Sequence, residues 1–130
     1  YSAHPIGAAA GDANLNLIDS LGLVANAKSA GAYFKAALVD ALGDHPNVGD
    51  IRGDGLLCAV EFVSDRDSRR FFDPAAKTGP QVAAALLKEG VIGRAMPQGD
   101  ILGFAPPLSI SEGEIDQVVG ATAKAVRSVL

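Results

Sequence analysis

Cysteine and aromatic side chains are scarce in this chain of 130 residues, which has one cysteine, five phenylalanines, two tyrosines and no tryptophan. One cysteine cannot form an internal disulfide and does not suffice for a zinc cluster, so we expect a reducing compartment, the cytoplasm. Because large rings are few while glycine and alanine are abundant, we expect a core of small side chains packed closely between helices and strands.

Dense runs of lysine and arginine are also missing, and the formal net charge is −4. This charge argues against nucleic acid or an anionic membrane as the partner. No apolar run approaches the roughly 20 residues that a helix needs to cross a bilayer, and we expect no signal peptide. The length suits one domain and 48% of the residues are hydrophobic, so we predict a single domain over residues 1–130 with a real core.

Apolar residues recur at helical spacing in the first third of the chain. The spacing predicts a packed helix over residues 5–20 and a second helix from Leu23 to Gly43, joined to the first by a tight turn. Two strands are expected next, at 48–52 and 56–63, on either side of the turn Gly53-Asp54-Gly55. The second strand is apolar on both sides except for Glu61, which is typical of a strand that is covered on both faces or lies at the centre of a sheet.

The second half of the chain begins with a charged loop at 64–77, which Phe71 and Phe72 are expected to anchor. A third helix is predicted from Thr78 or Gly79 to a stop at Gly90, and a last helix follows the capping box at 111–114. With the hairpin described next, the order of elements predicts an α+β fold: helices beside a mostly antiparallel sheet of about four strands.

Arg94 lies in a predicted strand, 91–96, in which every other residue is apolar or small. Ile92 and Met96 share its side of the strand. The residues Pro97-Gln98-Gly99 then suit a type II turn, so the chain reverses and presents one guanidinium on a hairpin. Two interpretations are open: an arginine that keeps its charge in water, or a fork that binds a carboxylate or phosphate through two parallel hydrogen bonds.

Other residues capable of chemistry have patterns that favour structural roles. His4 and His45 have no partners at ligand spacing, so we expect them at helix starts or turns and expect no metal site. Cys58 lies within an apolar strand, where a free cysteine behaves as a small hydrophobic residue.

Four ordered segments resemble the class III, pyridoxal-phosphate-dependent aminotransferases, the omega-transaminase family. They are YSAHPIGAAAG, DHPNVGDIRGDGLLCAVEFV, GVIGRAMPQGDILGFAPPL and APPLSISEGEID. The first is similar to the family's Tyr-Ser-Gly-His-Pro segment before a long helix, and the second to its paired strands with the pattern HP-x-VG-x-VRG-x-G. Ala3 stands where the family commonly has glycine, a difference that we expect to cost little.

The resemblance implies that the chain is the small C-terminal domain of a fold-type-I transaminase, docked in a homodimer against a larger upstream domain that binds pyridoxal 5'-phosphate. In the family, the arginine at the position of Arg94 pairs with the substrate carboxylate and swings aside for an amine without one. Small neighbours, Gly93 and Ala95, are expected to leave room for it. The resemblance also implies that Tyr1 and Ser2 lie near the cofactor phosphate of the partner subunit.

The Schiff-base lysine of the family is expected upstream of this chain. None of the lysines in this chain lies in a sequence motif like that around the family's Schiff-base lysine. Each of them fits a solvated helix face or a loop: Lys28, Lys35, Lys77, Lys88 and Lys124. We therefore expect the parent enzyme to move an amino group from an amine or omega-amino acid to a 2-oxo acid such as pyruvate, and these 130 residues alone to be inactive. The alternatives are another reaction of the family (aminomutase, racemase or decarboxylase) or a binding module without catalysis.

Overall fold

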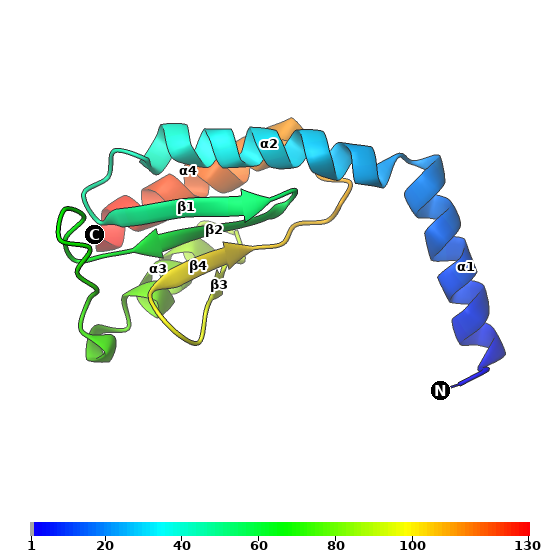
Figure 1. The fold of residues 1–130 in the computed structure, drawn as a ribbon, viewed down its shortest axis with the longest axis horizontal. Helices are drawn as coiled ribbons and strands as arrows, with labels where there is room; N and C mark the ends of the chain where they lie inside the picture. The colour runs from blue at the N-terminus through cyan, green and yellow to red at the C-terminus, as the bar shows by residue number, and fades with distance from the viewer. Residues whose placement is uncertain (1) are drawn as a thin grey trace.

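The computed structural model describes residues 2–130, which form one four-stranded sheet, the helices that cover it and a first helix that extends away from it (Figure 1). The order of elements is α1 (Pro5–Ser20), α2 (Leu23–Leu42), β1 (Val48–Asp54), β2 (Leu57–Phe62), the short 3-10 helix η1 (Pro74–Ala76), α3 (Thr78–Lys88), β3 (Arg94–Ala95), β4 (Ile101–Phe104) and α4 (Glu112–Val129). The strands lie in the order β1-β2-β4-β3, and every neighbouring pair is antiparallel. The predicted α+β class is confirmed.

Helices cover one face of the sheet and leave the other face open. α3 and α4 lie behind the sheet, and α2 runs beside β1 (Figure 1). Alternate residues of the two central strands enter the core: Cys58, Val60, Phe62, Leu102 and Phe104. Phe34 of α2 packs edge-on against Phe104, with ring centroids 5.5 Å apart. Because successive strand residues point to opposite faces, the residues between the core positions lie on the open face.

The turn between β1 and β2 is shorter than predicted. Asp54 still pairs with Leu57, so only Gly55 and Leu56 remain for the turn. Gly55 has a φ of +52°, which glycine adopts without the steric cost that a Cβ atom brings. β2 lies between β1 and β4, so of the two predicted alternatives the position at the sheet centre is confirmed.

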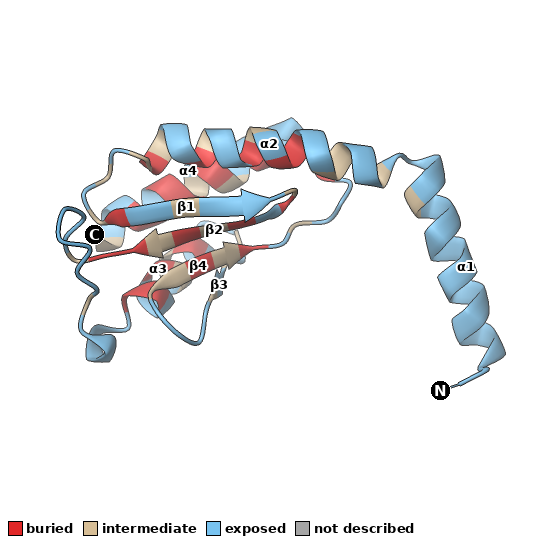
Figure 2. Ribbon diagram, in the orientation of Figure 1, coloured by how far each residue is buried: buried red, intermediate tan, exposed pale blue. Residues whose placement is uncertain are grey.

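Helix α1 has the predicted bounds but lacks the predicted packing. None of its residues is buried, and it extends away from the sheet and the other helices (Figures 1 and 2). Ile6 and Leu21, on its apolar stripe, are 73% and 62% exposed. Gly22, with a φ of +59°, turns the chain between α1 and α2. Because of this turn, α1 points away from the layer of helices that covers the sheet. Periodicity predicted an apolar side for α1 but could not identify what covers it.

The two histidines have the predicted structural roles. The N–H of Gly7 donates to Nδ1 of His4 at the start of α1, at 3.4 Å, and the N–H of Asn47 donates to Nδ1 of His45 in a turn, at 3.2 Å. Ala3 corrects an expectation: its φ is +60°, a left-handed conformation that costs an L-residue about 1–2 kcal/mol. The expectation that alanine costs little at this position is therefore wrong.

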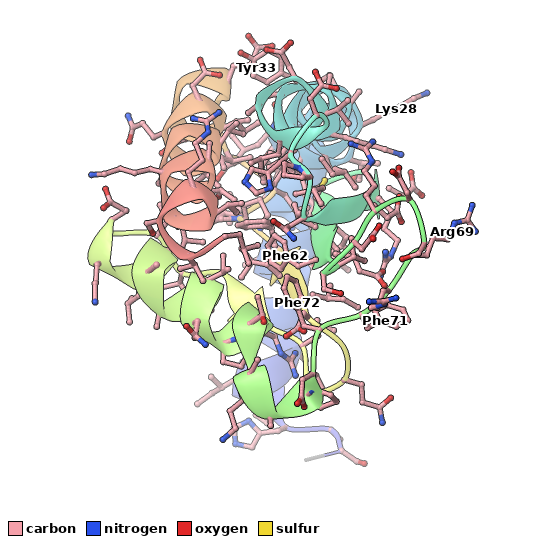
Figure 3. All side chains as sticks on the ribbon, turned by 90° about the vertical axis from the view of Figure 1, so that its left-hand side faces the viewer. Lys28, Tyr33, Phe62, Arg69, Phe71 and Phe72 are labelled. Atoms are coloured by element: carbon pink, nitrogen blue, oxygen red, sulfur yellow. The ribbon has the colours of Figure 1, made fainter. Side chains whose placement is uncertain are left out.

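The charged loop 64–77 is anchored by one of its two phenylalanines. Phe72 packs against the core, whereas Phe71 is 61% exposed and lies near Arg69 at the surface (Figure 3). The backbone of Asp65 bridges that of Arg70, and this contact closes the first part of the loop on itself. None of the helices in residues 2–130 has the length and apolarity needed to cross a membrane.

Candidate functional site

Arg94 lies on the open face, in the edge strand β3. The strand comprises 94–95 in place of the predicted 91–96, because only these two residues pair with β4. Arg94 pairs with Gly103, Gly103 faces Ala59 on the next strand, and Ala59 pairs with Arg52. These four residues form one cross-strand row, in which an arginine at each edge of the sheet flanks two small residues.

Arg94 and Arg52 line the same hollow, which has a volume of about 510 Å³. Met96 and Ile101 add apolar walls. Neighbouring strands lie about 4.8 Å apart, so the Cα atoms of the two arginines are roughly 14 Å apart and both side chains can extend over the small residues between them. Arg94 is exposed and takes part in none of the ion pairs found within residues 2–130, which leaves its guanidinium available to an anion.

Arg52, in contrast, is held by two carboxylates. Its Nη1 lies 2.9 Å from Oδ2 of Asp50 and 2.5 Å from Oε2 of Glu61. The hydrogen bond to Asp50 and, to a smaller extent, the hydrogen bond to Glu61 raise the pKa of Arg52, so the guanidinium stays charged. We call Asp50, Arg52 and Glu61 the ion cluster. Sequence reasoning missed it because Glu61 lies diagonally opposite Arg52 only when the hairpin turn has two residues.

Asp100 anchors the hairpin that carries Arg94. Its Oδ1 accepts a hydrogen bond from the N–H of Gly79 in the first turn of α3, at 2.7 Å, and its carbonyl accepts one from the N–H of Phe62, at 2.8 Å. The turn after β3 is therefore tied both to α3 and to the end of β2. Arg94 projects from a backbone that is fixed on both sides, while its side chain reaches into the open hollow.

Gly103, and not Gly93, leaves room for the arginine. A Cβ atom on Gly93 would lie 2.8 Å from the side chains of Leu86 and Leu102, which belong to the core. The expectation that Gly93 clears space for Arg94 is therefore wrong, because alternate strand residues point to opposite faces. Gly103 pairs directly with Arg94 on β4 and contributes no side chain to the floor of the hollow.

The cofactor contacts expected of Tyr1 and Ser2 stay predictions. Tyr1 lies outside the described residues. Ser2 is exposed and precedes α1, and the N-terminal end of that helix is far from the sheet (Figure 1). The fold therefore does not bring Ser2 close to Arg94.

The lysines and the cysteine are placed as expected. Each of the five lysines is exposed, and Lys28 points away from the protein (Figure 3). Cys58 is buried, and burial raises the pKa of its thiol, which stays protonated and inert. No lysine is among the residues that line the hollow beside Arg94.

Comparison with known proteins identifies the family. The class III aminotransferase model matches residues 1–126. The chain belongs to this family. It is 52% identical over 129 residues to a diaminobutyrate–2-oxoglutarate transaminase from Halomonas elongata, a match that covers 99% of this chain and 28% of that protein.

Solved transaminase structures share the fold of this aminotransferase chain. One, from work on directed evolution of transaminases by ancestral reconstruction, is 53% identical with a TM-score of 0.95 and covers 97% of this chain and 28% of its own. Another, a transaminase with L-alanine, is 40% identical with a TM-score of 0.90 and covers 97% of this chain and 29% of its own. The chain thus spans less than a third of the length of these relatives.

Proposed function

We propose that this chain is the C-terminal domain of an aminotransferase that moves an amino group from an amine or omega-amino acid to a 2-oxo acid such as pyruvate. Family membership supports the reaction class, and the coverage of 28% of the Halomonas relative supports a longer parent. The observation that carries the proposal is Arg94, an exposed guanidinium at the edge of a hollow of about 510 Å³, with no acidic partner among residues 2–130.

Arg94 suits a carboxylate because its planar, positively charged guanidinium can donate two parallel hydrogen bonds to two oxygens. Gly103 and Ala59 keep the floor beside it free of bulky groups, and the apolar walls at Met96 and Ile101 can contact the carbon chain of a substrate. The names of the relatives agree with an acidic substrate: one is a 2-oxoglutarate transaminase, and another was solved with L-alanine, the amino counterpart of pyruvate.

The rest of the active site belongs, in this proposal, to a larger upstream domain and to the partner subunit of a homodimer. Pyridoxal 5'-phosphate, bound there, supplies the electron sink that transamination requires. The exposed lysines agree with a Schiff-base lysine outside this chain, so the chain alone is expected to be inactive. The distance of Ser2 from the sheet agrees with a role for 1–2 near the cofactor phosphate of the other subunit.

Replacement of Arg94 in the full-length enzyme tests the proposal. Arg94→Ala should lower kcat/KM for pyruvate by an amount equivalent to about 2–4 kcal/mol, the usual range for loss of a charge-assisted pair, while amines without a carboxylate lose less. Arg94→Lys keeps the positive charge but not the two-pronged guanidinium, so its kcat/KM for pyruvate should lie between those of the unmodified enzyme and Arg94→Ala. Arg70→Ala, at an exposed position in the loop 64–77, is the matched control. An unchanged KM for the oxo acid in Arg94→Ala would contradict the assignment.

A further inference from the structure

We propose that the ion cluster sets the charge specificity of the hollow: Asp50 and Glu61 neutralise Arg52, so that Arg94 alone can bind an anion and acceptors with a second carboxylate are disfavoured. The inference rests on the proposed role of Arg94. It makes Glu61 a specificity-determining residue, although its carboxylate need not touch the substrate.

The geometry of the open face gives the first argument. Arg52 and Arg94 occupy opposite ends of one cross-strand row and line the same hollow, with only Ala59 and Gly103 between them. Two free arginines facing each other over such a floor would bind both ends of a dicarboxylate, because each guanidinium can hold one carboxylate in a fork. What prevents a symmetric site is the difference in their partners.

The charges of the ion cluster give the second argument. One guanidinium nitrogen of Arg52 contacts both carboxylates, so the positive charge is more than cancelled and the cluster carries a formal charge of −1. Of the ion cluster only Arg52 lines this hollow, whereas Asp50 and Glu61 line the neighbouring hollow together with Arg66 and Arg69. The hollow therefore has a free positive charge at Arg94 and a compensated one at Arg52. A second carboxylate that extends from Arg94 across the row meets Arg52, whose charge Asp50 and Glu61 already neutralise, so it finds no free cation there.

The position of Glu61 gives the third argument. Glu61 lies on the central strand β2, which is otherwise apolar, and only 22% of its side chain is exposed. Partly buried ion pairs contribute little net stability, because loss of hydration offsets the attraction. The electrostatic effect of Glu61 is stronger than that of a surface residue, since fewer water molecules screen it. Glu61 pairs across the sheet with Ile101, a wall of the hollow, so its charge acts on Arg52 and beside the hollow.

The test measures acceptor preference in the full-length enzyme as the ratio of kcat/KM for 2-oxoglutarate to that for pyruvate. Glu61→Gln keeps the size of the side chain and removes one negative charge, so the ratio should rise about three- to tenfold, the effect of one partly screened charge within several ångströms. Asp50→Asn should raise the ratio too, whereas Arg52→Gln should lower it. About 1 M salt, which shortens the screening length to roughly 3 Å, should shrink all three differences.

Glu89→Gln is the matched control. It removes the same charge from an ion pair of 2.7 Å with Lys124, which joins the end of α3 to α4 on the helical side of the molecule. Its ratio should equal that of the unmodified enzyme. If Glu61→Gln and Glu89→Gln give the same ratio, the proposed role of the cluster is wrong.

Two further results separate this inference from the proposed function. If Arg94→Ala weakens both acceptors while no cluster variant moves the ratio, only the role of the cluster fails. If Arg94→Ala leaves both acceptors unaffected, the assignment of Arg94 fails and the inference with it. Should Glu61→Gln not fold, the opposite shifts expected of Asp50→Asn and Arg52→Gln decide the question, because both positions are well exposed.

Discussion

At the scale of single residues, Gly103 shows how the absence of a side chain shapes the hollow. It pairs with Arg94 on one side and Ala59 on the other, so every larger residue at this position would rise from the floor between the two arginines. A Cβ atom there would lie 3.4 Å from Sδ of Met96, close enough that the flexible methionine must shift slightly. The φ angle of Gly103 is not in the positive range, so the backbone itself accepts other residues.

We therefore predict that Gly103→Val reduces activity more than stability. Valine suits a strand, so the free energy of unfolding should change by less than about 1 kcal/mol, while its side chain obstructs the hollow. In the full-length enzyme the KM for oxo acids should rise, most for those with larger carbon chains. Gly103→Ala, with a single added methyl, should have a smaller effect in the same direction. Equal KM values for all three proteins would show that substrate does not occupy this floor.

At the scale of elements, the contact between α2 and the β1–β2 turn aligns the helix with the sheet. A Cβ atom on Gly31, in the middle of α2, would overlap the backbone carbonyl of Gly55 in the turn. No side chain fits between the two segments, so helix and turn meet backbone to backbone. This contact holds the end of β1 near Arg52, one edge of the hollow.

Gly31→Ala should accordingly destabilise the fold. Although alanine favours a helix by about 1 kcal/mol relative to glycine, the overlap with a backbone that cannot move freely should lower the free energy of unfolding by about 1–3 kcal/mol net. Gly120→Ala is the control, because it lies on α4 with no atom within 4 Å of an added Cβ, and it should be neutral or stabilising. Urea denaturation of the two variants measures the difference, and equal stabilities would mean that α2 is not held at this contact.

At the scale of the whole molecule, the chain has a compact body and an unsupported helix. α1 and its C-cap residue expose a stripe of apolar residues that no other described segment covers: Ile6, Ala10, Ala13, Leu17 and Leu21 (Figure 2). A contiguous apolar surface of this kind usually marks a protein contact. In the proposed parent enzyme, the larger domain would cover it.

The isolated chain should therefore self-associate through α1. Its average mass in sedimentation equilibrium should rise with concentration, and the double substitution Leu17→Lys and Leu21→Lys should reduce this dependence by placing two charges on the stripe. Leu87→Lys, at a residue of α3 that is 60% exposed on the compact body, serves as the control and should not change it. A chain that is monomeric at every concentration would contradict the prediction.

Local spacing predicted the helices well. The bounds of α1 and the start of α2 follow from apolar periodicity, and α4 begins at its capping box, where the N–H of Ser111 donates to Oε2 of Glu114 at 2.8 Å. These signals act within a few residues along the chain, so they are present in the sequence itself. Strand ends were predicted less well, because the limits of β1 and β3 depend on which residues find partners on another strand.

The candidate site divides in the same way. The sequence by itself determined that Arg94 stands on a hairpin among residues that resemble the class III aminotransferases, since both the turn and the motifs are local. Only the tertiary structure decided that Arg94 shares an open face with Gly103 and the ion cluster around Arg52. A strand pattern specifies that alternate residues share a face, but the packing of helices decides which face stays open, and the pairing register decides which residues meet on it.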